Sequence, residues 1–215
     1  NRVAGEKGVN QKILLRVTPG IDPHTHKKIS TGSVESKFGI AIETGQAFSA
    51  AKAVLNLKNV TLCGFHCHIG SQIFESEPFA TALEIMLDFI KSVKEKLGFN
   101  TDMLNLGGGF GVRYTESDPK ISYTEKIREV ANSLNKQCAA LGLNTPKILT
   151  EPGRSLVADA GITLYTVGSV KEIAGYKNYV SVDGGMTDNP RYTLYESPYT
   201  VILASNADKK CDFTA

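Results

Sequence analysis

Two histidines two residues apart, His66 and His68, lie in the segment GFHCHIGSQI at residues 64–73. Imidazole nitrogens bind metal ions and transfer protons at neutral pH. On a β-strand, residues two apart share a face, so His66 and His68 point to one side while Phe65 and Cys67 point to the other. The pattern is typical of two kinds of site, a metal centre and a platform for a cofactor.

The metal interpretation depends on further ligands. His24 and His26 form a second His-x-His pair, so the 4 histidines of the chain fall into two such pairs. His-x-His on a barrel strand resembles the metal site of the amidohydrolases, which takes additional His and Asp ligands from later strands. No histidine follows His68 in this chain. We therefore expect no metal site, with His66 hydrogen-bonded at a strand end and His24 and His26 in a solvated loop.

Two later segments carry groups that bind anions. NLGGGFG contains Gly107, Gly108 and Gly109, whose backbone N–H groups can approach a phosphate closely, although a plain tight turn accounts for the same triplet. TEPGR places Glu151 and Arg154 close together. Arg suits phosphate or carboxylate and Glu suits a protonated ring nitrogen, but the two could also form a surface ion pair.

The elements that position these segments alternate between β-branched runs and helical periods. Helices are expected near 44–57, from Ser76 with Pro78 in its first turn to Gly98, and from Ser122 with Glu125 in capping-box spacing to Gly142. Strand-like runs cover 13–18, 60–66, 103–106 and 147–150. The third helix is expected to bury Ile127, Val130, Leu134 and Leu141.

Repeated βα units predict an α/β fold with a parallel sheet, either doubly wound or closed into a (β/α)8 TIM-type barrel. In both, ligands bind at the carboxyl ends of the strands, where the glycine-rich and polar segments of this chain stand. After about residue 160 the runs GITLYTVGSVKEI, YVSVDGG and YTVILAS are typical of strands without helices between them. We expect residues 1–160 to form the C-terminal part of a barrel and residues 161–215 to begin an all-β domain.

Composition excludes several classes of protein. With 41% apolar and 21% charged residues the chain is neither disordered nor collagen-like, and its apolar runs are too short to cross a bilayer. A net charge of +2 without a basic stripe argues against nucleic-acid binding. No signal peptide is evident, so Cys63, Cys67, Cys138 and Cys211 are expected to be reduced thiols of a cytoplasmic protein.

Taken together, GFHCHIGSQ, NLGGGFG and TEPGRS resemble the pyridoxal-phosphate-dependent decarboxylases of the alanine-racemase-like barrel fold. RVTPGIDPHTHKKISTG, SKFGI and VDGGMTDNPRYTLY are similar to segments of the members that convert meso-2,6-diaminopimelate into L-lysine and CO2, the last step of lysine biosynthesis. The resemblance covers nearly the whole chain. It implies pyridoxal 5'-phosphate as cofactor and diaminopimelate as substrate. The alternatives are a related decarboxylase for arginine, ornithine or carboxynorspermidine, and a non-catalytic decarboxylase-like binding protein.

The resemblance also implies roles for individual residues. His68 would stack on one face of the pyridoxal ring, and Glu151 would hold the pyridine nitrogen protonated so that the ring accepts electrons. Arg191 and Tyr195 would bind the distal carboxylate of the substrate, which a substrate ending in an amine lacks. The remaining cofactor contacts would come from Ser71, Gly107, Gly108, Gly109, Gly153 and Arg154, with Arg154 also near the substrate.

Two parts of the family pattern have no match in this sequence. The lysine that bonds to the cofactor normally stands in a Tyr-Ala-x-Lys-Ala-like strand, and Lys37 in SKFGI belongs to a different element. The Cys-Glu-Ser-Gly-Asp-like segment that completes the neighbouring site in a head-to-tail homodimer would begin just after Cys211. Since NRVAGEKGVNQ also lacks a starting Met, we expect an internal fragment of a homodimeric enzyme, inactive by itself.

Overall fold

The computed structural model describes residues 1–21 and 36–208. Its contacts define two compact units, one of Asn1–Val112 with Lys120–Leu156 and one of Arg113–Pro119 with Val157–Ala215. His24, His26 and Cys211 lie outside the described residues. Each unit contains its own sheet.

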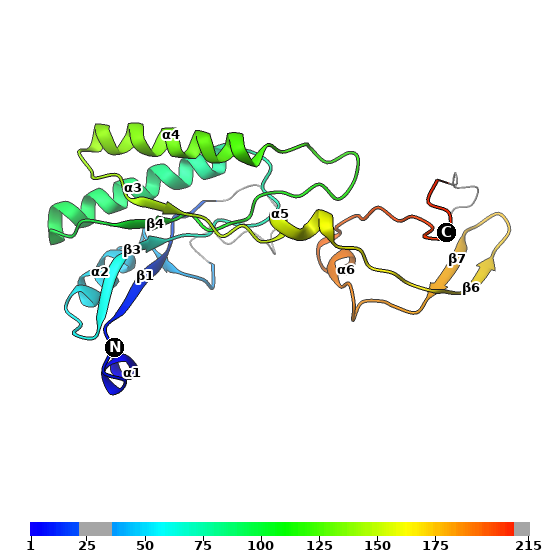
Figure 1. Ribbon diagram of the computed structural model, residues 1–215, viewed down its shortest axis with the longest axis horizontal. Coiled ribbons are helices and arrows are strands. Elements are labelled where there is room, and N and C mark those ends of the chain that lie inside the picture. The colour runs from blue at the N-terminus through cyan, green and yellow to red at the C-terminus, as the bar shows by residue number, and fades with distance from the viewer. Residues whose placement is uncertain (22–35, 209–215) are drawn as a thin grey trace. The chain divides into compact units, whose positions relative to one another are not determined.

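The first unit is built on a parallel sheet of 5 strands in the order β2-β1-β3-β4-β5 (Figure 1). The expected strands are confirmed, with β4 and β5 one residue shorter than expected and β1 two residues longer, while the short β2 was not expected. A short helix, α1 (Arg2–Glu6), precedes them. The strands are β1 (Gln11–Thr18), β2 (Ile40–Ala41), β3 (Val60–His66), β4 (Met103–Asn105) and β5 (Lys147–Leu149).

Three long helices connect these strands: α2 (Gln46–Leu55), α3 (Glu77–Leu97) and α4 (Tyr123–Leu141), of which α3 and α4 pack side by side (Figure 1). Gly98 and Gly142 end α3 and α4 in the left-handed conformation that glycine tolerates, as expected. Ser122 accepts a hydrogen bond from the backbone N–H of Glu125 at 3.3 Å, as the capping box predicts. Ser76 occupies the N-cap position of α3 without such a bond, because its backbone is helical and its hydroxyl accepts from Lys126 Nζ instead. Within the described residues no helix is both long and apolar enough to span a bilayer.

The core lies between the helices and one face of the sheet. Phe65, Leu83 and Leu104 are fully buried there. On α4, Leu134 is buried and Val130 and Leu141 pack against the core, but the expected burial of Ile127 is wrong because this side chain is 38% exposed. Ile127 stands one turn before Val130, at the edge of the apolar stripe and close to the beginning of the helix.

A register shift between β1 and β3 controls which side chains face the core. Ile13 pairs with Leu62 but Leu14 pairs with Gly64, so Cys63 is an extra residue in β3. Because of this bulge, Leu62 and Phe65 both join the core although they are three positions apart in the strand. Beyond the bulge, the register aligns Arg16 with His66.

The second unit contains two antiparallel strands, β6 (Val167–Glu172) and β7 (Asn178–Val182), followed by the short helix α6 (Arg191–Tyr195). The short helices α5 (Arg154–Val157) and η1 (Ala158–Ala160) stand before β6 in the chain. The expected strand in YTVILAS is wrong, since no strand is formed there within the described residues. That run is held by side chains: the Tyr199 ring lies 5.2 Å from the Tyr114 ring, and Thr200 Oγ1 donates to the Tyr114 carbonyl at 2.9 Å.

Candidate active site

The candidate site begins with a row of polar residues at the carboxyl ends of the parallel strands. Arg16 on β1 is in register with His66 on β3, and His66 is in register with Asn105 on β4. Residues in register on neighbouring strands share a face of the sheet, and the core residues Phe65 and Leu104 precede His66 and Asn105 on the opposite face. The row therefore faces away from the core helices. The next strand, β5, ends in register with Asn105 at Leu149, two residues before Glu151.

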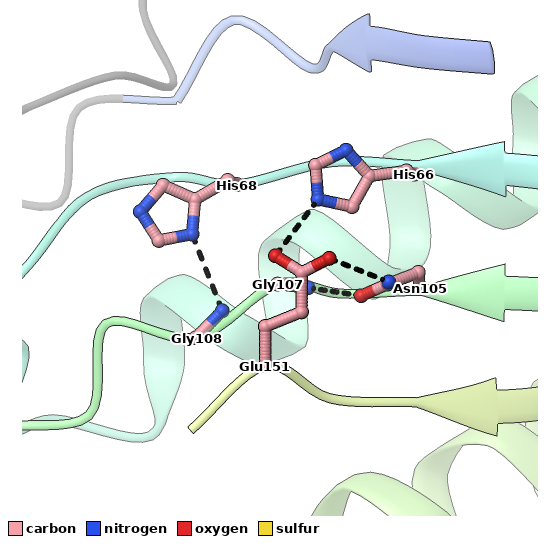
Figure 2. A network of polar contacts seen from close by, with 6 residues as sticks. All are labelled: His66, His68, Asn105, Gly107, Gly108 and Glu151. Atoms are coloured by element: carbon pink, nitrogen blue, oxygen red, sulfur yellow. Dashed lines mark hydrogen bonds and ion pairs between the residues drawn. The ribbon is translucent and has the colours of Figure 1, made fainter. Parts of the chain in front are cut away.

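Asn105 and Glu151 form the centre of a hydrogen-bond network (Figure 2). Asn105 Nδ2 donates to Glu151 Oε1 at 2.9 Å, and Asn105 Oδ1 accepts from the Gly107 N–H at 2.8 Å. The backbone N–H of Glu151 donates to the Gly107 carbonyl at 2.7 Å. Glu151 is thus tied to the glycine loop through both its backbone and its side chain.

His66 approaches the same carboxylate from the neighbouring strand (Figure 2). Its Nε2 lies 3.4 Å from Glu151 Oε2, within ion-pair distance but without hydrogen-bond geometry. Nε2 is therefore buried without a hydrogen-bond partner in the part of the chain that the structure describes. Burial lowers the pKa of His66 below its ordinary value of 6.5, while Glu151 opposes this shift and Arg16 adds to it. At neutral pH His66 is therefore an uncharged imidazole beside a carboxylate.

His68 has a different partner, the glycine loop. Its Nδ1 accepts a hydrogen bond from the Gly108 N–H at 3.2 Å, which fixes the orientation of the ring (Figure 2). Burial lowers the pKa of His68, and the positive charge of Arg16 lowers it further. A neutral imidazole whose orientation is fixed is suited to stacking against an aromatic ring, the role that the family resemblance implies for His68.

The glycine loop packs backbone against backbone with two other segments of the site. A Cβ on Gly108 would lie 2.1 Å from the Glu151 carbonyl oxygen, and one on Gly109 would lie 2.1 Å from the Gly70 carbonyl oxygen. Gly109 also has a positive φ of 92°. The chain itself therefore requires glycine at both positions. The Gly109 N–H has no hydrogen-bond partner among the residues that the structure describes, which leaves it available to an anion.

Arg154 supplies the positive charge that such an anion would need, and Ser71 supplies a hydroxyl beside it. A guanidinium nitrogen of Arg154 donates to Ser71 Oγ, which joins the loop after His68 to the beginning of α5. Gly153 directly precedes α5, with open space where a Cβ would stand. The structure thus brings the expected cofactor residues of the first unit together around the ends of β3, β4 and β5.

Arg191 and Tyr195, the expected substrate residues, lie together in the second unit on α6. The Arg191 guanidinium is 5.4 Å from the centre of the Tyr195 ring and 5.6 Å from that of the Tyr114 ring. One of its terminal nitrogens donates to Ser197 Oγ at 3.3 Å, while Nε is buried with no hydrogen-bond partner among residues 1–21 and 36–208. A guanidinium held between two aromatic rings keeps its charge and its planar set of donors for a carboxylate.

The residues of the first unit fit pyridoxal phosphate in the chemistry that each end of this cofactor needs. The Gly109 N–H, Ser71 and Arg154 suit the phosphate, and the half-exposed Glu151 carboxylate suits a ring nitrogen that carries a proton. Within the part of the chain that the structure describes, no three His, Cys, Asp or Glu side chains are grouped to hold a metal ion. A separate hollow of about 310 Å³ between α3 and α4 contains none of the expected site residues.

Sequence reasoning missed two residues of this site. Asn105 is the first residue of NLGGGFG, and its position at the end of a strand before a glycine triplet was the available signal. Arg16 stands in an ordinary strand, and it reaches the site only through the register set by the bulge. No local pattern marks that register.

Comparisons with known proteins identify the family of this chain. The family model for the pyridoxal binding domain of pyridoxal-dependent decarboxylases matches residues 1–158. A diaminopimelate decarboxylase from Bacillus methanolicus is 47% identical over 99% of this chain and 49% of its own length, and that of Bacillus subtilis (strain 168) is 44% identical over 97% and 48%. The chain thus spans about half the length of these relatives.

Solved structures give the same result. A diaminopimelate decarboxylase from M. jannaschii in complex with L-lysine superposes with a TM-score of 0.82 at 35% identity, covering 94% of this chain and 45% of that chain. The enzyme of Helicobacter pylori, also complexed with L-lysine, gives 0.80 at 31% identity over 96% and 49%. The expected fold class, part of a (β/α)8 barrel followed by the start of a β domain, is confirmed by these neighbours and by the two sheets.

Proposed function

The chain belongs to the pyridoxal-dependent decarboxylases, and on that premise we propose that the protein removes CO2 from meso-2,6-diaminopimelate to give L-lysine. The observation that carries this proposal is the meeting of His68, Glu151, Ser71 and Arg154 around one glycine loop at the strand ends. These residues provide a carboxylate, a neutral imidazole ring and an anion site beside one loop. The name and the bound L-lysine of the similar structures support the choice of substrate and product.

Each site residue of the first unit has a defined role in this proposal. Pyridoxal phosphate supplies the electron sink for the breaking bond when it is bound. Glu151 holds a proton on the ring nitrogen, which keeps the ring electron-poor. His68 covers one face of the ring and keeps water from it, because its orientation is fixed by Gly108. Ser71, Arg154 and the Gly109 N–H bind the phosphate.

Arg191 and Tyr195 supply substrate specificity in the proposal. Diaminopimelate carries a carboxylate at both ends, and its distal one can accept charge-assisted hydrogen bonds from a guanidinium. Ornithine and arginine end in a cationic group, which a second cation repels. The stacked position of Arg191 against Tyr195 and Tyr114 supports a fixed carboxylate site there.

We also propose a cytoplasmic location and a homodimer, each of which rests on the resemblance to the family. The free thiols of Cys63, Cys67 and Cys138 agree with a reducing compartment. Sedimentation of the protein encoded at full length would test the dimer. A single species with the mass of one chain at micromolar concentration would contradict it.

The test of the function is a comparison of substrates. The protein encoded at full length, purified with pyridoxal phosphate, is assayed for CO2 release from meso-diaminopimelate, ornithine, arginine and carboxynorspermidine. We expect release from diaminopimelate alone, with L-lysine as product, and an Arg191→Met variant should raise KM for diaminopimelate roughly 100-fold through the lost carboxylate pairing. Release from ornithine or arginine would favour a related decarboxylase, and no release from any of the four would favour a binding protein.

A further inference from the structure

Asn105 is the buried residue that joins the two ends of the site, and the roles implied by the family resemblance leave it out. The residue is 7% exposed, at the end of the short strand β4. On one side lies the glycine loop, which faces the phosphate end of the cofactor in the proposed function. On the other side lies Glu151, which faces the ring nitrogen.

The orientation of the Asn105 amide is fixed by its two partners. Gly107 presents an N–H, which only the oxygen of the amide can accept, at 2.8 Å. The amide nitrogen is then directed at Glu151 Oε1, 2.9 Å away. A reversed amide would set N–H against N–H and oxygen against carboxylate oxygen. The network therefore assigns a donor to Glu151, and Figure 2 shows both bonds leaving the same side chain.

Glu151 needs such a donor because, among the described residues, little else restrains its side chain. Its side chain is 54% exposed, and the neighbouring His66 nitrogen is 3.4 Å away without hydrogen-bond geometry. A half-exposed glutamate samples several rotamers, and ordering it costs free energy unless a contact holds it. The hydrogen bond from Asn105 links the carboxylate to the loop that its own backbone already contacts.

We propose that Asn105 is a positioning residue that holds the Glu151 carboxylate against the ring nitrogen of the cofactor and fixes its distance from the glycine loop. The proposal rests on the proposed function, because it takes the cofactor as the ligand of the site formed by the glycine loop and Glu151. It adds that the interaction between Glu151 and the ring nitrogen depends on a neighbour that does not itself touch the cofactor.

The test measures binding of two ligands to the cofactor-free protein encoded at full length: pyridoxal phosphate, and its analogue with a C–H group in place of the ring nitrogen. Asn105→Asp keeps an oxygen for the Gly107 N–H and nearly the same shape, but it replaces the donor to Glu151 by a carboxylate. We expect the wild-type protein to prefer pyridoxal phosphate, and the variant to lose roughly 10-fold of that preference, the size of a lost hydrogen bond to a charged group. Asn135→Asp, at an exposed position of α4, controls for the added charge and should keep the preference.

Each outcome decides a separate point. A variant that weakens both ligands equally, or that keeps the wild-type preference, overturns the role of Asn105, since a merely structural residue does not distinguish the two ligands. A wild-type protein that binds neither ligand contradicts the proposed function itself. Equal wild-type binding of both ligands contradicts the contact between Glu151 and the ring nitrogen, and the inference with it. If Asn105→Asp does not fold, Asn105→Ser, whose hydroxyl is too short to bridge both partners, serves in the same comparison.

Discussion

Glu151 is the residue on which the proposed chemistry depends most directly. Glu151→Gln keeps the shape of the side chain but removes the carboxylate that holds a proton on the ring nitrogen. We expect kcat on diaminopimelate to fall by about 10²- to 10⁴-fold, the usual contribution of a positioned acid or base. Steady-state assays of the protein encoded at full length measure this, with Glu84→Gln, at an exposed position of α3, as the control. A fall of less than threefold would show that Glu151 has no part in the reaction.

The two site histidines predict a pH dependence of stability. Burial lowers the pKa of both His66 and His68 in the folded protein below 6.5, so the unfolded chain binds more protons than the folded one at pH values just below 6.5. The free energy of unfolding of the cofactor-free protein should therefore decrease as pH falls from 7.5 to 5.5. Urea titrations at the two pH values measure the change.

A matched variant isolates the contribution of these histidines. His66→Asn with His68→Asn removes both titrating groups, so the difference in unfolding free energy between the two pH values should become smaller. An unchanged difference would assign the pH dependence to other groups.

At this scale, the sequence predicts a site residue where residue type and chemistry coincide. His68, Glu151, Ser71 and Arg154 were each expected in the site, and the structure brings them together. The role of Asn105 was not predicted, because an asparagine at a strand end is an ordinary feature and its two partners come from positions 107 and 151. A role that consists of linking two other residues has no signature of its own in a single sequence.

Among the elements, the glycine loop is the one that tolerates least change. Gly109→Ala would place a methyl group 2.1 Å from the Gly70 carbonyl oxygen at a φ of 92°. We expect a loss of about 2 to 4 kcal/mol in the free energy of unfolding from backbone strain and displacement of the neighbouring loop. Chemical denaturation of the cofactor-free protein measures this. Gly153→Ala is the matched control, because open space surrounds that position, and equal losses in the two variants would contradict the packing argument.

The helix ends give a paired prediction. Ser122 caps α4 by accepting from the Glu125 N–H, while Ser76 at the corresponding position of α3 does not cap. Ser122→Ala should cost about 1 kcal/mol of stability, the usual value for an N-cap. Ser76→Ala should cost less, because it loses only a bond to Lys126. Thermal unfolding of the two variants side by side decides the order, and a larger effect at Ser76 would be evidence against the capping assignment.

Helices and long strands were predictable because periodicity and caps are local signals, as the boundaries of α3 and α4 show. The short strand β2 and the run YTVILAS were not. A strand is defined by a hydrogen-bonded partner, and Ile40–Ala41 finds one on β1, whereas Tyr199 and Thr200 contact Tyr114 through side chains. Apolar alternation alone does not distinguish these cases.

For the whole molecule, the reactivity of the buried thiols indicates whether the fold is intact. Cys67 and Cys138 are fully buried, and burial raises the pKa of the Cys67 thiol to about 12. The thiolate is the reactive form, so neither residue should be alkylated by iodoacetamide in the native protein, while both should be in denaturant. Peptide mass mapping measures the modified fraction. Rapid native modification of Cys67 would show that the sheet opens easily beneath the site.

The division of the chain into two units is the feature of the whole molecule that is hardest to predict from the sequence. The boundary near residue 160 stays a prediction. It was drawn from the change, along the sequence, from alternating strands and helices to strand-like runs without helices between them. The contacts also assign residues 113–119 to the later unit, through Tyr114 with Tyr199 and Thr200. The assignment of residues 113–119 to the later unit depends on contacts between residues about 85 positions apart. The local composition of the sequence does not predict such contacts.

The extra residue at Cys63 decides which one-residue deletions β3 tolerates. In a regular strand, side chains alternate between the two faces, so one residue added or removed reverses the assignment of every side chain beyond it. The bulge is the exception: with Cys63 deleted, uninterrupted pairing would still align Ile13 with Leu62, Leu14 with Gly64 and Arg16 with His66. A one-residue alignment gap at Cys63 would therefore keep His66 on the face of the site, whereas a gap beyond the bulge would turn the remaining side chains of the strand to the opposite face.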